Sequence, residues 1–130
     1  MKKITFAALL FITTMISAQD RDGNLFYSTV EKTDSIYKAS VDIFEVGNIE
    51  YIEIELVDEN KDELASALAQ LISRDGKYFL SFQEKEKQVF PEDISLTLKN
   101  EYNDIKYPQI NIKLFDKHLR VLDYSQKIFY

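Results

Sequence analysis

The residues best suited to acid–base chemistry lie on one predicted strand, Ile49–Val57, which reads IEYIEIELV. Glu53 and Glu55 are two positions apart, so an extended chain places both carboxylates on the same face. Paired carboxylates carry out general acid–base catalysis in glycoside hydrolases. A solvated sheet face has the same spacing without catalysis, and nothing nearby in the sequence indicates a shifted pKa. We therefore assign no catalytic residue, and we interpret Tyr51, Glu53 and Glu55 as a surface for a basic partner protein.

The acidic segment Asp58–Glu63 begins with the D-x-N-x-D spacing of a calcium loop. An EF-hand also requires glycine at the sixth position and a bidentate glutamate at the twelfth. Glu63 and Ala69 occupy those positions, so no EF-hand site is predicted. A weaker calcium site near this segment stays an open hypothesis. We assign no metal-binding or cofactor-binding residue.

Other motifs do not support nucleophilic or zinc-dependent catalysis. His118 is the single histidine, whereas a serine triad or a three-histidine zinc site requires more partners. The segment Ser35–Lys38 matches the S-x-x-K motif of penicillin-binding enzymes, but its context is strand-like and the companion motifs are missing. The chain has no cysteine, so thiol catalysis and cysteine-ligated metals are excluded.

The N-terminal segment MKKITFAALLFITTMISA has the three-part layout of a secretory signal peptide. Lys2 and Lys3 precede an uncharged, mostly apolar run, Ile4–Ile16. This run is shorter than the roughly 20 residues that a membrane-spanning helix needs. Small residues end the segment, so we predict cleavage after Ala18 and export to the periplasm or the extracellular space.

The composition limits the class of partner. The chain has 22 acidic and 16 basic residues, a net charge of −6 at pH 7, and no segment in which Lys and Arg concentrate. Binding to nucleic acid or to an anionic membrane surface is therefore not expected. After the predicted signal peptide (residues 1–18) and a flexible leader (residues 19–24), residues 25–130 are predicted to form a single β-rich domain that is not embedded in a membrane.

Alternation of apolar and polar residues predicts half-buried strands. Three segments show it clearly, and their apolar positions are Ile52, Ile54 and Leu56, then Ile94, Leu96 and Leu98, then Ile110, Ile112 and Leu114. Less regular strands are predicted at Leu25–Val30, Ser35–Val46 and Lys77–Phe82, with a closing pair at His118–Tyr124 and Lys127–Tyr130. The total is about seven strands.

Turn signals separate these strands. The Gly-Asn pair at 47–48 lies between two strand-like runs and predicts a hairpin, which would bring Glu45 near the paired carboxylates. The Asp-Gly pair at 75–76 predicts a second turn. The segment Glu84–Lys87, with the sequence EKEK, is predicted as a solvated loop.

One short helix is predicted within Asp58–Ser73. Its apolar residues recur at helical spacing, and Asn60 and Glu63 resemble a capping box. A strand at Ala67–Ile72 is the competing prediction, and the alanines of this segment disfavour it because alanine is depleted in strands. The apolar residues of the predicted helical stripe are Leu64, Leu68, Leu71 and Ile72.

The segments ISLTLKN and YPQINIKLFDKHLRVLDYS, within Asp93–Tyr124, resemble the last three strands of an immunoglobulin-like domain. The resemblance implies an antiparallel immunoglobulin-like β-sandwich, here of about seven strands with one short helix. The chain lacks the cysteine pair and the tryptophan that are typical of antibody domains. An α+β fold, with one helix covering an antiparallel sheet, is the alternative.

These observations favour a small exported, non-enzymatic binding or accessory domain that acts through protein–protein contacts. The Asn100–Tyr107 loop offers Tyr102 and Tyr107 as further contact residues, because exposed tyrosines are common at interfaces. A periplasmic inhibitor or immunity-type protein that binds a basic enzyme is the first alternative, and an uncharacterised hydrolase is the second.

Overall fold

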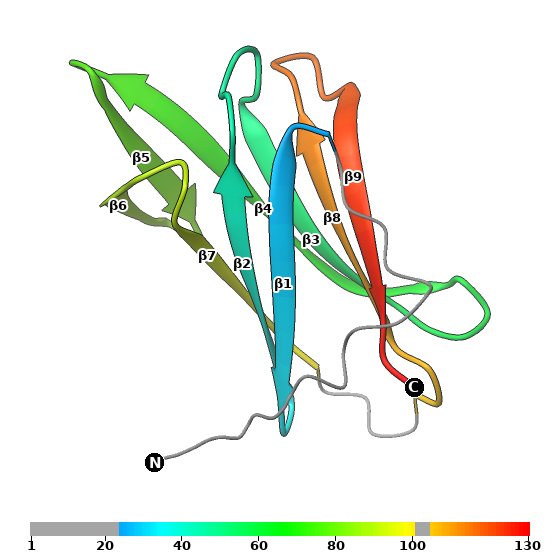
Figure 1. The fold of residues 1–130 in the computed structure, drawn as a ribbon. Coiled ribbons are helices and arrows are strands. Elements are labelled where there is room, and N and C mark those ends of the chain that lie inside the picture. Colours follow the sequence, from blue (N-terminus) through cyan, green and yellow to red (C-terminus); the bar gives the residue numbers. More distant parts are fainter. Residues whose placement is uncertain (1–23, 101–104) are drawn as a thin grey trace.

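The computed structural model describes residues 24–100 and 105–130, and within these ranges the chain forms strands and no helix. The strands build two antiparallel sheets (Figure 1). No helix in the described ranges could therefore cross a membrane. The strands are β1 (Phe26–Thr33), β2 (Ile36–Ile43), β3 (Tyr51–Val57), β4 (Glu63–Arg74), β5 (Lys77–Phe82), β6 (Lys85–Val89), β7 (Ile94–Lys99), β8 (Gln109–Phe115) and β9 (Val121–Ile128).

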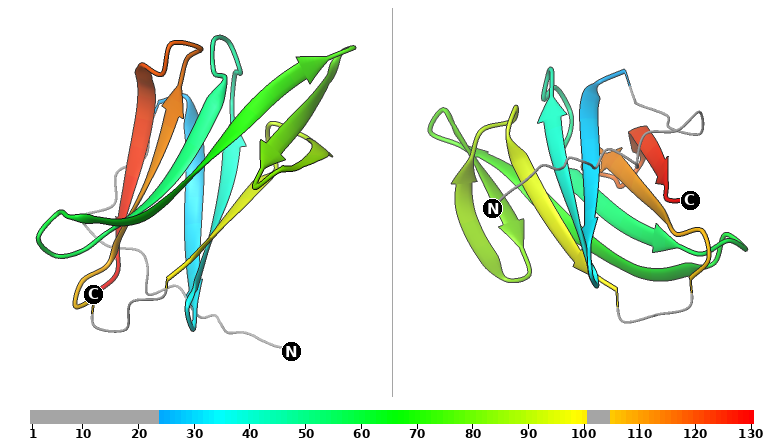
Figure 2. Two further views of the ribbon diagram at one scale, coloured as in Figure 1. Left: turned by 180° about the vertical axis from the view of Figure 1, so that it is seen from behind. Right: turned by 60° about the horizontal axis from the view of Figure 1, so that its bottom comes forward.

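The two sheets differ in width. The smaller sheet has three strands in the order β1-β2-β7, and the larger has six in the order β6-β5-β4-β3-β8-β9. The sheets lie as two layers, and the β5–β6 hairpin extends past β7 on the side away from β2 (Figure 2). The larger sheet is therefore only partly covered by the smaller one.

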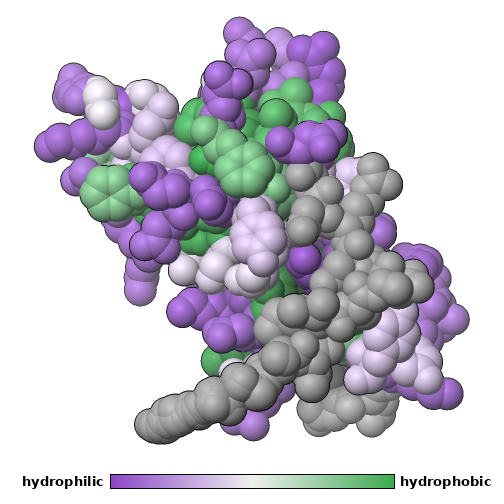
Figure 3. All heavy atoms as spheres, viewed as in Figure 1, coloured by the Kyte–Doolittle hydropathy of each residue, from purple (hydrophilic) through white to green (hydrophobic). Residues whose placement is uncertain are grey.

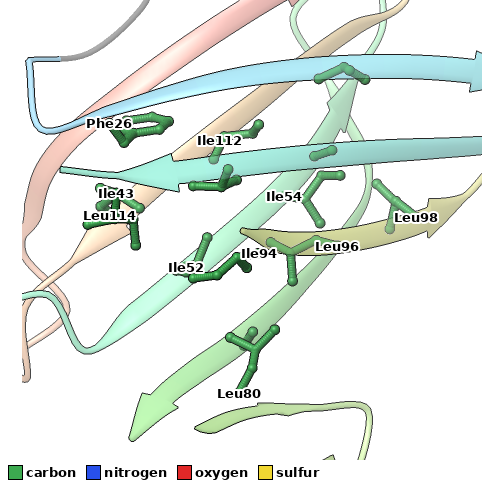
Figure 4. Packing of buried hydrophobic residues seen from close by; sticks show 14 of the residues in the cluster. Phe26, Ile43, Ile52, Ile54, Leu80, Ile94, Leu96, Leu98, Ile112 and Leu114 are labelled. Carbon is green, nitrogen blue, oxygen red and sulfur yellow. The ribbon is translucent and has the colours of Figure 1, made fainter. Parts of the chain in front are cut away.

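One apolar cluster fills the space between the layers. Alternate residues of β2 and β7 face alternate residues of β3 and β8, so Ile43 lies beside Leu114 and Leu96 lies beside Ile54 (Figure 4). Ile54 and Ile112 are fully buried. Leu80 on β5 lies at the margin of the cluster (Figure 4). Burial of these strand faces stabilises the fold, since the chain has no disulfide.

Two hydrogen bonds and one aromatic contact join β1 and β2 of the smaller sheet to the β9 side of the larger sheet. The hydroxyl oxygens of Ser28 and Ser125 are 2.9 Å apart and fully buried. The backbone N–H of Leu25 donates to Oδ2 of Asp123 at 2.8 Å. The rings of Tyr37 and Phe129 pack edge-on, with centroids 5.6 Å apart. The layers are thus connected by specific contacts as well as by apolar packing.

Two tight turns hold the β4–β5–β6 meander. Asp75 and Gly76 both have positive φ, and Arg74 pairs directly with Lys77 across this two-residue turn. Positive φ at both central positions suits the right-handed twist of a hairpin, so the predicted Asp-Gly turn is confirmed. The pair at 83–84, Gln-Glu, adopts positive φ at the next turn without a glycine.

The helix predicted within Asp58–Ser73 is wrong, because Glu63–Arg74 forms the longest strand, β4. Residues 63–70 pair with β3 and residues 70–74 pair with β5, so ladder hydrogen bonds extend along the whole strand. These two ladders outweigh the helix propensity of its alanines and leucines. Leu68 and Leu71, assigned to one helical stripe, lie on opposite faces of the strand: Leu68 is 45% exposed and Leu71 is buried.

The hairpin predicted at 47–48 is also wrong. β2 pairs with β1 and β7, whereas β3 pairs with β4 and β8, so the intervening segment crosses from one sheet to the other. Val41 and Ile52 both enter the core, but from opposite layers. Glu45 therefore does not lie across a hairpin from Glu53.

Three smaller expectations change as well. The EKEK segment, predicted as a loop, supplies most of β6, which ends directly before Phe90 and Pro91. The closing pair of segments is one continuous strand, β9. The described residues contain nine strands instead of about seven. The predicted signal peptide (residues 1–18) and nearly all of the leader lie outside the described residues.

Candidate functional site

The outer face of the larger sheet, on β4, β3 and β8, gathers the polar residues that the sequence singles out. Glu53 pairs with Lys113 on β8, and Glu55 pairs with Asn111. On the other side, Glu55 pairs with Ser66 of β4. The predicted common orientation of Glu53 and Glu55 agrees with this register, because alternate residues of a strand share a face.

Polar contacts connect five side chains of this face and of the loop before β4 into a row. Lys61 Nζ donates to Gln109 Oε1 at 2.8 Å, and Gln109 Nε2 donates to Asn111 Oδ1 at 2.7 Å. Asn111 Nδ2 then donates to Glu55 Oε1 at 2.9 Å, and Lys113 Nζ lies 3.6 Å from the same oxygen. We call these five residues the polar row.

Glu55 is buried, which corrects the expectation of a fully solvated acidic face. Burial disfavours its charge, but hydrogen bonds from Asn111 and Glu63 and the charge of Lys113 outweigh that effect and lower its pKa. The sequence-based view that nothing nearby would shift a pKa is therefore wrong. Glu55 is a fixed anion at the centre of the polar row.

The neighbouring carboxylates are perturbed in the opposite direction. Burial raises the pKa of Glu53, and the charge of Glu55 raises it further. The pKa of Glu63 is raised mainly by its hydrogen bond with Glu55. In this bond the protonated carboxyl group of Glu63 is the donor, and the carboxylate of Glu55 is the acceptor. Lys113 lowers both values but does not cancel the effect. Three carboxyl groups thus gather near the ammonium group of Lys113, and the site becomes negatively charged overall when Glu53 and Glu63 ionise as well as Glu55.

Apolar side chains adjoin this charge on the same face. Leu68 of β4 pairs with Glu53 and is 45% exposed. Tyr51 and Phe115 are directly opposite one another on β3 and β8, and both are half-buried. The outer face thus combines acidic and aromatic groups that are open to a partner.

Tyr107 does not belong to this surface as a neighbour of Tyr51. It precedes β8, whereas Tyr51 pairs with Phe115 at the opposite end of that strand, roughly 25 Å away at the rise of an extended chain. Tyr107 instead packs against Tyr130, with ring centroids 5.6 Å apart. Tyr102 lies outside the described residues.

The other sequence candidates occupy turns. Asp58 Oδ1 accepts the backbone N–H groups of Asn60 and Asp62 at 2.8 and 3.0 Å, so this carboxylate caps a turn and not a helix. His118 lies in the β8–β9 turn, where Asp116 Oδ1 accepts its backbone N–H. Among residues 24–100 and 105–130, no group of three or more potential ligands is arranged to hold a metal ion.

Sequence reasoning missed four residues around Glu55: Asn111, Lys113 and Glu63 contact it, and Gln109 donates a hydrogen bond to Asn111, so the set is Gln109, Asn111, Lys113 and Glu63. The first three occupy the polar positions of an alternating strand, so their common face was readable from the sequence. The pairing of β8 with β3 is a contact between distant segments, which periodicity does not reveal. Glu63 was assigned to a helix start and so was not considered beside Glu55.

Comparison of the chain with protein-family models, with curated proteins and with solved structures finds no match. The function is therefore argued from the geometry and electrostatics of the outer face.

Proposed function

We propose that this chain is a small exported, non-enzymatic module that binds a basic partner protein in the cell envelope or outside the cell. The contact surface is the outer face of β4, β3 and β8, with Glu53, Glu55 and Glu63 at its centre. One observation carries the proposal: Glu53, Glu55 and Glu63 lie together on this face, and among the described residues only Lys113 forms an ion pair with any of them. The raised pKa values of Glu53 and Glu63 agree with this crowding of carboxyl groups.

A partner lysine or arginine would relieve this repulsion. It would lie near Glu53 and Glu63 and stabilise their ionised forms, which the free protein disfavours. Tyr51, Leu68 and Phe115 would supply apolar contact around the charge, as aromatic groups do in many interfaces. A basic enzyme blocked at its active site, as an inhibitor or immunity-type protein would do, is a special case of this partner.

The proposal includes the fold class. We infer an immunoglobulin-like β-sandwich, supported by two antiparallel sheets whose inner faces share one apolar cluster. Such domains commonly bind partners through a sheet face or an end loop. The inference that the chain binds and does not catalyse rests on the polar row, in which Glu55 is held by Asn111 and Lys113.

The test is affinity capture with the chain from Gln19 to Tyr130 against envelope and secreted fractions of the source cells. We expect one stoichiometric basic protein, bound at low salt and released at high salt, because exposed charges are screened by ions. The double variant Glu53→Gln with Glu63→Gln should lose most of this binding. The matched control, Glu31→Gln with Glu84→Gln, changes two exposed glutamates on other surfaces and should retain it.

Binding should also depend on pH. Affinity should rise with pH through the raised pKa values of Glu53 and Glu63, since a cationic partner prefers their ionised forms. Equal capture by the parent and the double variant would refute the proposed surface. Turnover of a glycan or peptide substrate that disappears in Glu53→Gln would instead establish the hydrolase alternative.

A further inference from the structure

The inner face of the β5–β6 hairpin is only partly covered by the smaller sheet. That sheet ends at β7, which pairs with β2 alone among the described strands. The larger sheet continues past this edge with β5 and β6 (Figures 1 and 2). A fourth strand beside β7 would extend the smaller sheet over the hairpin. The other edge of β7 thus offers unpaired backbone groups, which can pair with an extended chain.

A groove occupies this position. Its volume is about 380 Å³, and it lies between β7 and the inner face of the hairpin. The half-buried Phe82 supplies apolar surface to the groove, and Leu80, which is 2% exposed, also lines it. On the β7 side it is bounded by Ser95 and Thr97. The complete lining is Leu80, Phe82, Gln83, Lys85, Glu86, Lys87, Ser95 and Thr97.

The groove has a positively charged wall. Lys85 and Lys87 pair with Phe82 and Leu80, so both lysines lie on the inner face of the hairpin. Both are exposed, and neither forms an ion pair within residues 24–100 and 105–130. Glu86 is on the opposite face of β6, and Arg74 binds it at 2.6 Å. The lysines therefore attract negative charge into the groove.

Figure 3 shows the surroundings of this region on the face seen in Figure 1. Hydrophilic side chains cover much of the hairpin, and hydrophobic atoms show between them. This combination suits a strand with apolar and acidic side chains better than a purely apolar one.

We propose that the groove between β7 and the β5–β6 hairpin binds an extended acidic segment of a partner protein, which adds a fourth strand beside β7. Backbone hydrogen bonds to the β7 edge would supply affinity, and side-chain pockets would supply selectivity. Small apolar side chains would contact Phe82 above the buried Leu80, and carboxylates would contact Lys85 and Lys87. This site is separate from the outer face of β4, β3 and β8.

The test uses a synthetic nine-residue peptide with blocked ends and a fluorophore. Threonines alternate in it with two valines followed by two glutamates, so valines and glutamates share one face of the strand. The reversed sequence is tested too, since either strand direction can pair with β7. Binding is measured by fluorescence anisotropy, and amide shifts in NMR spectra locate the site.

We expect saturable binding with shifts confined to β7 and the β5–β6 hairpin. Lysines in place of the peptide's glutamates should abolish binding, and so should N-methylation of its backbone. The variant Lys85→Glu with Lys87→Glu should bind about tenfold more weakly, because two favourable charge contacts become repulsive. The control Lys77→Glu with Lys117→Glu reverses two exposed lysines outside the groove lining and should bind normally.

Three results would overturn the proposal. The glutamate peptides fail to bind, the lysine peptide binds equally well, or the protein dimerises with concentration through β7, so that a second copy is the occupant. Glu53→Gln with Glu63→Gln should not affect peptide binding. The groove and the outer face can therefore fail independently.

Discussion

At the scale of single residues, two glutamates with the same spacing and orientation differ because their surroundings differ. Glu55 receives hydrogen bonds from its neighbours and stays ionised while buried. Glu53, one pleat away, has a raised pKa, first through burial and then through the charge of Glu55. The amino-acid pattern places both on one face, and the cross-strand partners decide which carboxylate is stabilised as an anion.

The raised pKa of Glu53 predicts that Glu53→Gln stabilises the protein at neutral pH. A carboxyl whose pKa is higher in the folded state contributes stability below its unfolded pKa, and this contribution disappears as pH rises through the folded pKa. Glutamine removes the cost of ionisation, so Tm should increase by about 2 °C at neutral pH. The advantage should vanish below the ordinary pKa of 4.5. Thermal melts followed by circular dichroism across this pH range provide the measurement.

The matched control for this experiment is Glu31→Gln, at an exposed position of β1. Its Tm should follow that of the parent protein at each pH. If Glu53→Gln lowers Tm at neutral pH, the ionised carboxylate of Glu53 stabilises the fold and the electrostatic description of the outer face is wrong.

At the scale of elements, β4 shows why helical spacing misleads. Ala65, Ala67, Ala69 and Leu71 face inward, whereas Ser66, Leu68, Gln70 and Ile72 alternate with them on the outer face. The period of two is therefore present in the sequence, together with the spacing of a helix. Pairing with two neighbouring strands selects the strand, because it satisfies the backbone and buries the alanine face.

The inner face of β4 carries small side chains, and Ala69 among them is enclosed by its neighbours. Ala69 is fully buried and pairs with Ile52 of β3. Ala69→Leu would force larger atoms into the packed region between the sheets, so it should lower the free energy of unfolding by about 1–3 kcal/mol. Urea denaturation measures this change.

The adjacent exposed residue provides the control. Gln70→Leu adds a similar apolar side chain on the outer face, and it should change stability by less than about 0.5 kcal/mol. The strand assignment predicts this difference in stability between the two positions, because neighbouring residues of a strand lie on opposite faces. Comparable effects at positions 69 and 70 would therefore contradict the strand assignment.

At the scale of the whole molecule, contacts between distant segments join the layers. Ser28 on β1 and Ser125 on β9 are 97 positions apart in the chain, yet their hydroxyl groups form a buried hydrogen bond. Each hydroxyl would be a buried, unsatisfied polar group without the other. This pair therefore reports directly on the approach of the two sheets.

A double-mutant cycle tests this contact. Ser28→Ala and Ser125→Ala should each cost about 1 kcal/mol, because each leaves the other hydroxyl without its partner. The double variant should cost less than the sum of the two, with a coupling free energy of about 1 kcal/mol. Urea unfolding of all four proteins gives the cycle. Additive effects would show that the two hydroxyl groups do not interact in solution.

Local pattern was sufficient to predict several elements. Alternation identified β3, β7 and β8 with correct faces, a less regular pattern identified β5, and the Asp-Gly pair identified the turn between β4 and β5. These features depend on residues close together in the chain, where side-chain period and turn conformation are set locally. Tyr51, Glu53 and Glu55 were placed on one face for the same reason.

Tertiary contacts were required for the remainder. They place β2 and β3 in different sheets, convert the predicted helix into β4, and bring Asn111 and Glu63 to Glu55. They also leave β7 as an edge beside an overhanging hairpin, which creates the groove. Each of these features depends on which distant strands pair. The free energy that selects the pairing comes from burying the apolar faces of strands against one another. A local sequence pattern shows which face of a strand is apolar but not which distant strand it pairs with.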